Sequence, residues 1–265
     1  MARSGSSRRT FLKNSAAAAA ATPYFFWSAR ARASKSPNDR LGIGCVGMGS
    51  RGNFDAREHA AFGDIVAVCD VDANRVEAAK NDKKIGQGKA AGYGDYRRLL
   101  ERKDIDVVSI VTTDQWHTKI AIEALEAGKH VFCEKPLTLT LDENLLIRNA
   151  CRKYKDRVFF VGTQQRSDKA RFLRAINMVQ KGLLGEIKKI TAGVKGGSKG
   201  GPFTKTQPPP ELNWDFWLGQ APKVEYIKER CHYQYRWWYE YSGGKFTDWG
   251  AHHVDIATWA IGQDQ

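Results

Sequence analysis

The stretch RLGIGCVGMGSRGNFDAREHAAFGDIVAVCDVD, which runs from Arg40 to Asp72, decides the predicted fold. Its apolar run from Leu41 to Val46 has the length and composition of a buried parallel strand. The next residues fit the pattern G-x-G-x-x-G and are followed by a helical segment, with glycines at Gly47, Gly49 and Gly52. A second apolar strand, Ile65 to Cys69, ends at Asp70. A strand, a glycine-rich turn, a helix and a second strand ending in an acid predict a dinucleotide-binding βαβ unit.

Each part of the glycine-rich loop has a physical role in this prediction. Gly47 permits the tight turn, and Gly49 lets backbone N–H groups approach a pyrophosphate. Gly52 allows the helix to pack closely on the strand. The helix begins near Ser50 and points its positive end at the phosphates, and Arg51 lies on the same loop. The alternative is a glycine-rich strand-to-helix turn that binds no ligand.

The acid at the end of the second strand indicates which dinucleotide is bound. The Asp70 carboxylate can accept a hydrogen bond from a ribose 2′-hydroxyl and would repel a 2′-phosphate. We therefore predict NAD as the cofactor. NADP stays possible, because Arg75 or Arg51 could offset the repulsion.

Composition and charge exclude several classes of protein. Of 265 residues, 42% are hydrophobic and 27% are charged, which is ordinary for a soluble protein. The net charge is +13, but residues 1–33 hold six basic side chains and no acid, and much of the remaining positive charge is scattered over predicted helix faces. No basic stripe is interleaved with aromatic residues, so we predict no nucleic-acid partner. The five cysteines are odd in number and lack C-x-x-C spacing, which favours buried small hydrophobes over disulfides or a metal site.

Residues 1–33 have the features of an export signal. Ser7 to Lys13 reads SRRTFLK, a twin-arginine pattern, and is followed by the apolar run Ala16–Ala21. Ala31–Ala33 offers a small-x-small cleavage site. Because Pro23 interrupts the apolar core, which is far shorter than the ~20 residues of a membrane span, we predict no stable span. The prediction is a twin-arginine signal peptide and a periplasmic protein, with residues 34–39 as a linker; the alternative is a disordered basic arm.

From Arg40 to Thr163 the sequence alternates between strand and helix patterns. Three further strands are predicted, and Asp95 and Thr140 are candidate helix caps; the strands are Ile105–Val111, His130–Cys133 and Val158–Val161. A polar, glycine-rich loop is predicted to run through Gly94. This alternation predicts a Rossmann-type, doubly wound parallel sheet over residues 40–163, with ligands at the carboxyl ends of its strands.

The pattern changes over residues 164–265, where we predict an incomplete α+β second domain. We expect an amphipathic helix over Asp168–Lys181, a strand over Gly185–Val194 and a long surface loop over Lys195–Glu211. A segment rich in tryptophan, tyrosine and phenylalanine follows, starting at Trp214 and including Trp217, Trp237 and Trp238. Such a concentration can line a sugar site or fill a core, and on its own it favours a core.

Two more motifs complete a resemblance to a known family. Glu134-Lys135-Pro136 follows the fourth predicted strand, and the sequence from Gly243 to Asp255 reads GGKFTDWGAHHVD. With the glycine-rich loop and Asp70, these motifs resemble the Gfo/Idh/MocA family of nicotinamide-dependent oxidoreductases, which includes glucose–fructose oxidoreductase and inositol dehydrogenase. The likeness covers Arg40 to the end of the chain and is strongest to secreted members with twin-arginine leaders. It implies hydride transfer between NAD(P) and a sugar, cyclitol or related polyol.

The resemblance also implies catalytic roles. Lys135 would hydrogen-bond the reacting hydroxyl, His252 would be the general base, and Asp248 would orient the imidazole or bind a neighbouring hydroxyl. Asp248, His252 and Asp255 are spaced i, i+4 and i+7, so one helix would place them on one face. Each also has a structural alternative: a helix cap for Asp248, a core histidine for His252 and a surface lysine for Lys135.

Further cofactor contacts implied by the family lie at two strand ends. They are assigned to five residues: Thr112, Trp116, His117, Glu134 and Lys135. The family usually reads Thr-Pro-Asp-His-Trp-His at the first of these ends, whereas here Thr113 replaces the proline and Gln115 the first histidine. Contacts from this loop are therefore less specific than those from the glycine-rich loop.

The end of the chain departs from the family, whose members continue into a large, mostly antiparallel sheet. This sequence stops at Gln265, and we expect a fragment whose full-length form is a homo-oligomer. Two alternative functions remain open. One is an NAD-dependent glycoside hydrolase of the same family, and the other is a cofactor-binding fragment without catalysis.

Overall fold

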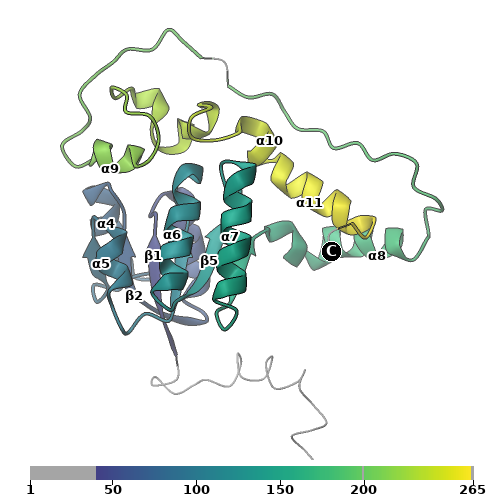
Figure 1. Ribbon diagram of the computed structural model, residues 1–265, viewed down its shortest axis with the longest axis horizontal. Helices are drawn as coiled ribbons and strands as arrows, with labels where there is room; N and C mark the ends of the chain where they lie inside the picture. Colours follow the sequence, from purple (N-terminus) through teal and green to yellow (C-terminus); the bar gives the residue numbers. More distant parts are fainter. Residues whose placement is uncertain (1–39, 199, 264–265) are drawn as a thin grey trace, which may run out of the picture. The chain divides into compact units, whose positions relative to one another are not determined.

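The chain's architecture rests on a six-stranded parallel sheet in the order β3-β2-β1-β4-β5-β6 (Figure 1). The computed structural model describes residues 40–198 and 200–263, so the predicted leader and linker lie outside the described residues. The strands are β1 (Leu41–Val46), β2 (Gly63–Cys69), β3 (Ala91–Tyr93), β4 (Val107–Ile110), β5 (His130–Glu134) and β6 (Phe159–Gly162). This order confirms the Rossmann-type fold. The prediction missed β3, because three residues that pair only with β2 leave little periodic signal.

Helices cover both faces of the sheet (Figure 1). They are α3 (Ser50–His59), α4 (Ala73–Asn81), α5 (Tyr96–Leu100), α6 (Asp114–Glu126) and α7 (Leu141–Lys153). Helices α3 and α4 share one buried cluster with Ile43 and Ile65, whereas α5, α6 and α7 share the other with Val108 and Val131. Strands buried on both faces explain why their sequences are continuously apolar.

Both predicted helix caps are confirmed. The Asp95 carboxylate accepts a hydrogen bond from the Arg97 N–H at the start of α5. Thr140 forms a capping box with Glu143, in which each side chain accepts from the other residue's backbone N–H. These caps set where α5 and α7 begin and therefore where the preceding strand-end loops lie.

The second region, after Gly162, contains short helices and long irregular segments. Its α-helices are α8 (Arg174–Gln180), α9 (Trp214–Leu218), α10 (Gly244–Asp248) and α11 (Gly250–Ala260). The predicted helix Asp168–Lys181 is a π-type turn, Lys169–Leu173, followed by α8. The strand predicted at Gly185–Val194 is wrong, because all of this segment is exposed and unpaired with any strand among the described residues. An alternating pattern forms a strand only where a neighbour supplies backbone hydrogen bonds. The surface loop Lys195–Glu211 is confirmed over its described residues.

The aromatic segment is anchored on the carboxyl end of the sheet. A β-bridge joins Leu212 to Asp72, and the Asn213 N–H donates to the Val71 carbonyl at 2.9 Å. Trp217 is buried, stacks on Trp214 with ring centroids 4.7 Å apart, and belongs to a separate cluster. Trp217 thus belongs to a core cluster, as the core interpretation expects, and Trp214 packs against it while partly buried.

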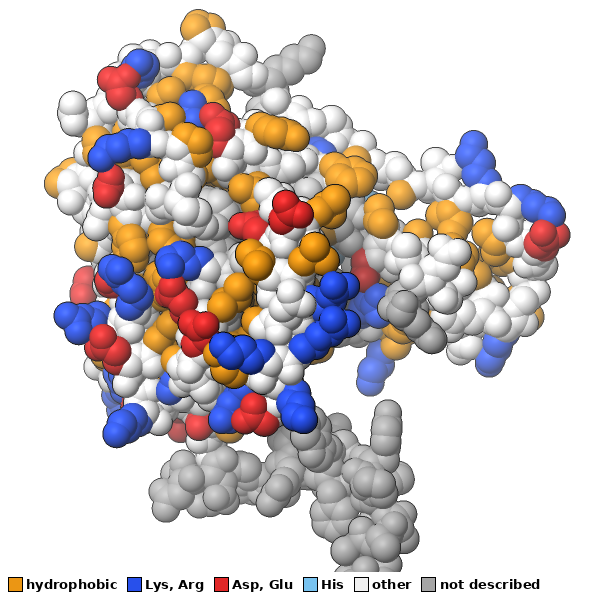
Figure 2. All heavy atoms as spheres, in the orientation of Figure 1, with side chains coloured by type: hydrophobic (Ala, Val, Ile, Leu, Met, Phe, Trp, Pro, Cys, Tyr) orange, Lys and Arg blue, Asp and Glu red, His pale blue; other side chains and the backbone are white. Residues whose placement is uncertain are grey.

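The surface in Figure 2 carries basic and acidic side chains side by side over the helices of the sheet. Many are paired, as Arg57 is with Asp82 and Lys119 with Glu123, which fits the solvated surface that the sequence predicted. No helix within residues 40–198 and 200–263 has the length and apolar character to cross a membrane. Over the same residues, no group of three or more His, Cys, Asp or Glu side chains could hold a metal ion.

Candidate active site

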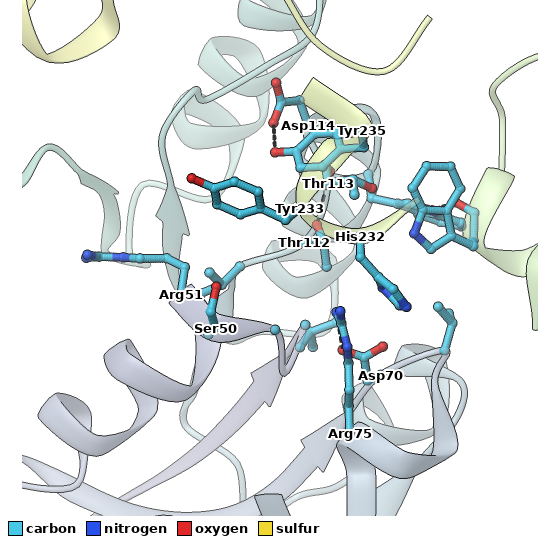
Figure 3. A pocket seen from close by; sticks show the side chains of 18 of the residues that line it. Ser50, Arg51, Asp70, Arg75, Thr112, Thr113, Asp114, His232, Tyr233 and Tyr235 are labelled. Atoms are coloured by element: carbon cyan, nitrogen blue, oxygen red, sulfur yellow. Dashed lines mark hydrogen bonds and ion pairs between the residues drawn. The ribbon is translucent and has the colours of Figure 1, made fainter. Parts of the chain in front are cut away.

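A cavity of about 790 Å³ lies at the carboxyl ends of β1, β2, β4 and β5, under the aromatic segment (Figure 3). Ten of the predicted site residues line it: Gly47, Gly49, Ser50, Arg51, Gly52, Asp70, Thr112, Trp116, Lys135 and Asp248. Three do not: His117, Glu134 and His252. The structure therefore brings together most of the predicted dinucleotide and catalytic residues at one strand-end cavity.

The glycine-rich loop has the backbone that a dinucleotide cradle needs. Gly47 has a φ of +89°, which other residues rarely adopt. A Cβ on Gly52 would lie 1.8 Å from the Gly47 carbonyl oxygen, so only glycine allows α3 to approach β1 this closely. Gly49 caps α3 without any side-chain hydrogen bond, which leaves N–H groups of the first turn for an anion. These features fit a bound pyrophosphate.

Asp70 lines the end of this cavity beside the glycine-rich loop. Its buried carboxylate accepts hydrogen bonds from the Met48 N–H at 2.7 Å and the Asp72 N–H at 3.0 Å. Burial raises its pKa, while the charge of Arg75, 3.9 Å away, opposes the shift. His232, from the aromatic segment, lies beside Asp70 and Arg75 in Figure 3. Its Nε2 is 3.5 Å from Asp72, and sequence reasoning missed it.

Arg51 lines the cavity, but its guanidinium is committed to two buried acids. It pairs with Asp55 at 2.6 Å and with Glu134 at 3.1 Å. Burial raises the pKa of both carboxyls, that of Glu134 to about 7, and Arg51 opposes the shift. Glu134 accepts a hydrogen bond from the Lys135 N–H and one from the Gln164 amide. Glu134 therefore fixes the backbone of the loop that carries Lys135, although Glu134 itself does not line the cavity.

At its other end the cavity joins the two regions through Lys135 and Asp248. The Lys135 Nζ donates to the Asp248 carboxylate at 2.9 Å and to its backbone carbonyl at 3.0 Å. Arg236 Nη1 donates to the other carboxylate oxygen at 2.9 Å. Burial would raise the pKa of Asp248, but the hydrogen bond and charge of Lys135, with Arg236, lower it overall. The surface-lysine alternative for Lys135 is therefore wrong.

His252 lies close to this pair but not on the cavity wall. The chain stays helical through Trp249, which joins α10 to α11 with a backbone hydrogen bond on either side, and Asp255 pairs with Arg166 at 2.8 Å. Burial, with the positive charge of Lys135, lowers the pKa of His252 to about 4, so its imidazole is neutral. Its Nδ1 is buried and has no hydrogen-bond partner among the described residues.

His117 joins two loops instead of lining the cavity. Its Nδ1 is 2.7 Å from the Pro136 carbonyl and its Nε2 is 3.2 Å from the Thr112 carbonyl. It thus holds the end of β4 against the end of β5. Trp116 lines the cavity and donates from its indole N–H to the Trp217 carbonyl at 3.0 Å.

Sequence reasoning missed a polar group on the wall of the cavity. The buried Asp114 carboxyl accepts hydrogen bonds from the Tyr235 hydroxyl at 2.6 Å and from Ser242 (Figure 3). Burial raises the pKa of Asp114. Burial also raises the pKa of Tyr235 well above its usual value, so the tyrosine hydroxyl stays protonated. The one available signal for Asp114 was its place just after a buried strand. Tyr235 and Arg236 carried none, because the aromatic segment has no regular period.

Comparisons with known proteins agree with this geometry. The model for the Gfo/Idh/MocA oxidoreductase family, NAD-binding Rossmann fold, matches residues 41–163, and the model for that family's C-terminal alpha/beta domain matches residues 174–265.

Three individual proteins illustrate the similarity. Inositol 2-dehydrogenase of Salmonella typhimurium is 35% identical over 149 residues, 55% of this chain and 43% of that protein. A glycosyl hydrolase family 109 protein of a Shewanella species is 34% identical over 212 residues, 69% of this chain and 45% of that protein. A solved NAD-binding protein from Listeria innocua is 26% identical, with a TM-score of 0.60 over 82% of this chain and 54% of that one. The chain spans less than half the length of these two curated relatives.

Proposed function

We propose that this chain, which belongs to the Gfo/Idh/MocA oxidoreductase family, is part of an NAD(H)-dependent dehydrogenase. The proposed substrate is a sugar, cyclitol or related polyol, and the reaction takes place at one of its CH–OH groups. One observation carries the proposal. A single cavity has a dinucleotide cradle at one end and the Lys135–Asp248 pair at the other. The similarity to an inositol 2-dehydrogenase supports the polyol class.

The residues at the catalytic end suit the oxidation of an alcohol. The Lys135 ammonium, held by Asp248, donates to the substrate oxygen and stabilises the negative charge that develops there. The neutral imidazole of His252 is the proposed proton acceptor. It lies close enough to Lys135 for the positive charge of the lysine to lower the pKa of the imidazole. A bound nicotinamide would supply the hydride acceptor.

The cofactor end favours NAD. Asp70 lines the cavity, where one of its carboxylate oxygens accepts from Met48 in the glycine-rich loop and the other from Asp72, so a 2′-phosphate placed there would meet a buried carboxylate. NADP remains an alternative, since Arg75 lies 3.9 Å from this acid. The leader pattern further suggests export to the periplasm by the twin-arginine pathway, and the full-length enzyme is proposed to be a homo-oligomer.

Binding of NADH to the 265-residue chain tests the cofactor site. Fluorescence of the nicotinamide should show saturable binding that Asp70→Ala weakens by about tenfold or more, given ~1.5–3 kcal/mol for hydrogen bonds to a charged group. Glu101→Ala, on the exposed surface of the sheet domain, is the control and should bind NADH normally. Equal binding by wild type and Asp70→Ala would refute the cofactor assignment.

Activity then tests the reaction. NADH formation on a panel of sugars and inositols should fall by roughly 10²–10³ in Lys135→Met, as when an oxyanion donor is removed. Substrate consumption without net NADH would instead support the glycoside-hydrolase alternative. Normal NADH binding with no turnover of any compound would support the non-catalytic alternative.

A further inference from the structure

His232, in the aromatic segment, has an unfavourable backbone conformation. Its φ is +50°, in the left-handed region that a residue with a side chain rarely adopts. Within residues 40–198 and 200–263, the other non-glycine residue with a positive φ is Gln87, which is exposed in a polar loop. Strain of this kind persists only where the surrounding structure enforces it, and it is concentrated at functional sites.

The imidazole of His232 is also poorly hydrogen-bonded within the protein. Its Nδ1 is buried and has no hydrogen-bond partner among the described residues. Its Nε2 lies 3.5 Å from the Asp72 carboxylate, at the outer limit for a hydrogen bond. The strained backbone and the unpaired Nδ1 both reduce stability, so contacts within the protein do not account for a histidine at this position.

The location of His232 points to a ligand. It lines the cavity with Asp70 and Arg75, and the three side chains lie side by side in Figure 3. Asp70 follows β2, where the acid of a Rossmann fold binds the adenosine ribose of the dinucleotide. His232 therefore lies at the end of the cavity where the proposed NAD would place that ribose.

The imidazole has hydrogen-bonding groups that its neighbours lack. An ionised Asp70 can only accept hydrogen bonds, and Arg75 can only donate them. Burial and the charge of Arg75 lower the pKa of His232, although Asp72 opposes this shift, so the imidazole is neutral at neutral pH. A neutral imidazole has one donor and one acceptor, which suits a ribose hydroxyl that both donates and accepts.

We propose that His232 is a cofactor-binding residue, which hydrogen-bonds the adenosine ribose of the dinucleotide from the aromatic segment. The inference rests on the proposed function, because it assigns a further residue to the same cofactor. Asp70 accepts from a ribose hydroxyl, and His232 supplies a second hydrogen bond to the same sugar. The second region then contributes to both ends of the cavity, through His232 at one end and Asp248 at the other.

Three ligands that share parts of NADH test the proposal. Binding of NADH and of reduced nicotinamide mononucleotide to the 265-residue chain would be followed by nicotinamide fluorescence, and binding of ADP-ribose by calorimetry. In His232→Ala, the affinities for NADH and ADP-ribose should fall by about three- to tenfold, as for the loss of one hydrogen bond. The mononucleotide has no adenosine and should bind wild type and variant equally.

Two more variants separate this contact from folding. His232→Gly removes the strain of the positive φ, so it should keep its thermal stability and still lose affinity for NADH and ADP-ribose. Lys228→Ala, at an exposed residue of the same segment, is the control and should bind all three ligands normally.

The outcomes distinguish this inference from the proposed function. Unchanged NADH affinity in both His232 variants would overturn the inference and leave the proposed function standing. An equal loss for NADH and the mononucleotide would also overturn it, because the residue would then act on the whole site. A wild type that binds none of the three ligands would overturn both.

Discussion

The sheet domain and the aromatic segment are held together by different kinds of contact. In the sheet, each strand from β1 to β6 pairs with a neighbour and each face is filled by a buried cluster. Residues 212–248 form no strand and are held by ring contacts, one β-bridge and ion pairs to the sheet domain. Backbone pairing builds the scaffold, and side-chain contacts place the second half of the site on it.

This difference predicts that the two regions fail separately. Removing a side chain from the aromatic cluster should loosen the aromatic segment alone, whereas distorting the glycine-rich loop should affect the sheet and its ligand. The first two of the following experiments test this, and the last two test the charge environment where the regions meet; they run from the largest expected effect to the smallest.

Trp217→Ala should have the largest effect. It removes a buried ring that stacks on Trp214 and meets Tyr241 edge-on, for a cost of ~3–5 kcal/mol. Hydrogen exchange should quicken over residues 212–242 and stay slow in β1 and β2. The control is Tyr239→Ala, at a residue that is 91% exposed, and it should leave exchange unchanged. Faster exchange across the whole sheet would mean that the regions do not fail separately.

Gly52→Ala should act on the sheet domain instead. Its Cβ would meet the Gly47 carbonyl, so α3 must move away from β1, at a cost of about 3 kcal/mol, the upper end for overpacking. Chemical denaturation and NADH titration should both show the loss. Gly94→Ala places its Cβ in open space and serves as the control. An unaltered affinity for NADH in Gly52→Ala would contradict the assigned cradle.

Glu134→Gln should change how stability depends on pH. Because burial raises the pKa of Glu134 from 4.5 to about 7, the folded state retains a proton that the unfolded state releases as pH rises. The wild type should lose stability between about pH 4.5 and 7, and the variant should lack this loss. Between pH 4.5 and pH 8, the free energy of unfolding of the variant should rise by on the order of 2 kcal/mol relative to that of the wild type. If denaturant unfolding shows that the stability of wild type and variant depends on pH in the same way, the raised pKa of Glu134 is contradicted.

The smallest effect is on the pH at which the His252 imidazole takes up a proton. Its imidazole should titrate near pH 4 by NMR, because burial and the charge of Lys135 both disfavour the cation. In Lys135→Met the midpoint should rise, since one cause is removed. His252→Gln assigns the resonance. A midpoint near 6.5 in the wild type would show that the imidazole is not held in this environment.

The sheet could be predicted from sequence because its signals are local. Continuous apolar strands, the glycine pattern and the caps at Asp95 and Thr140 each depend on neighbouring residues, and the structure confirms them. The strand predicted at Gly185–Val194 was wrong because alternation cannot reveal whether a partner strand is present.

The candidate site was predictable only in part. Lys135 and Asp70 follow buried strands, so the topology of the sheet places them. Arg236 and Tyr235 lie in short 3₁₀ turns, where position depends on ring packing that leaves no periodic signal. His252 lies near Lys135, as predicted, but off the cavity wall.

The aromatic segment touches the sheet domain at both ends of the cavity, through Leu212 beside Asp72 and through Asp248 on Lys135. Because the segment is tied to the sheet domain at two separate points, removing one attachment should leave the other in place and the segment still docked.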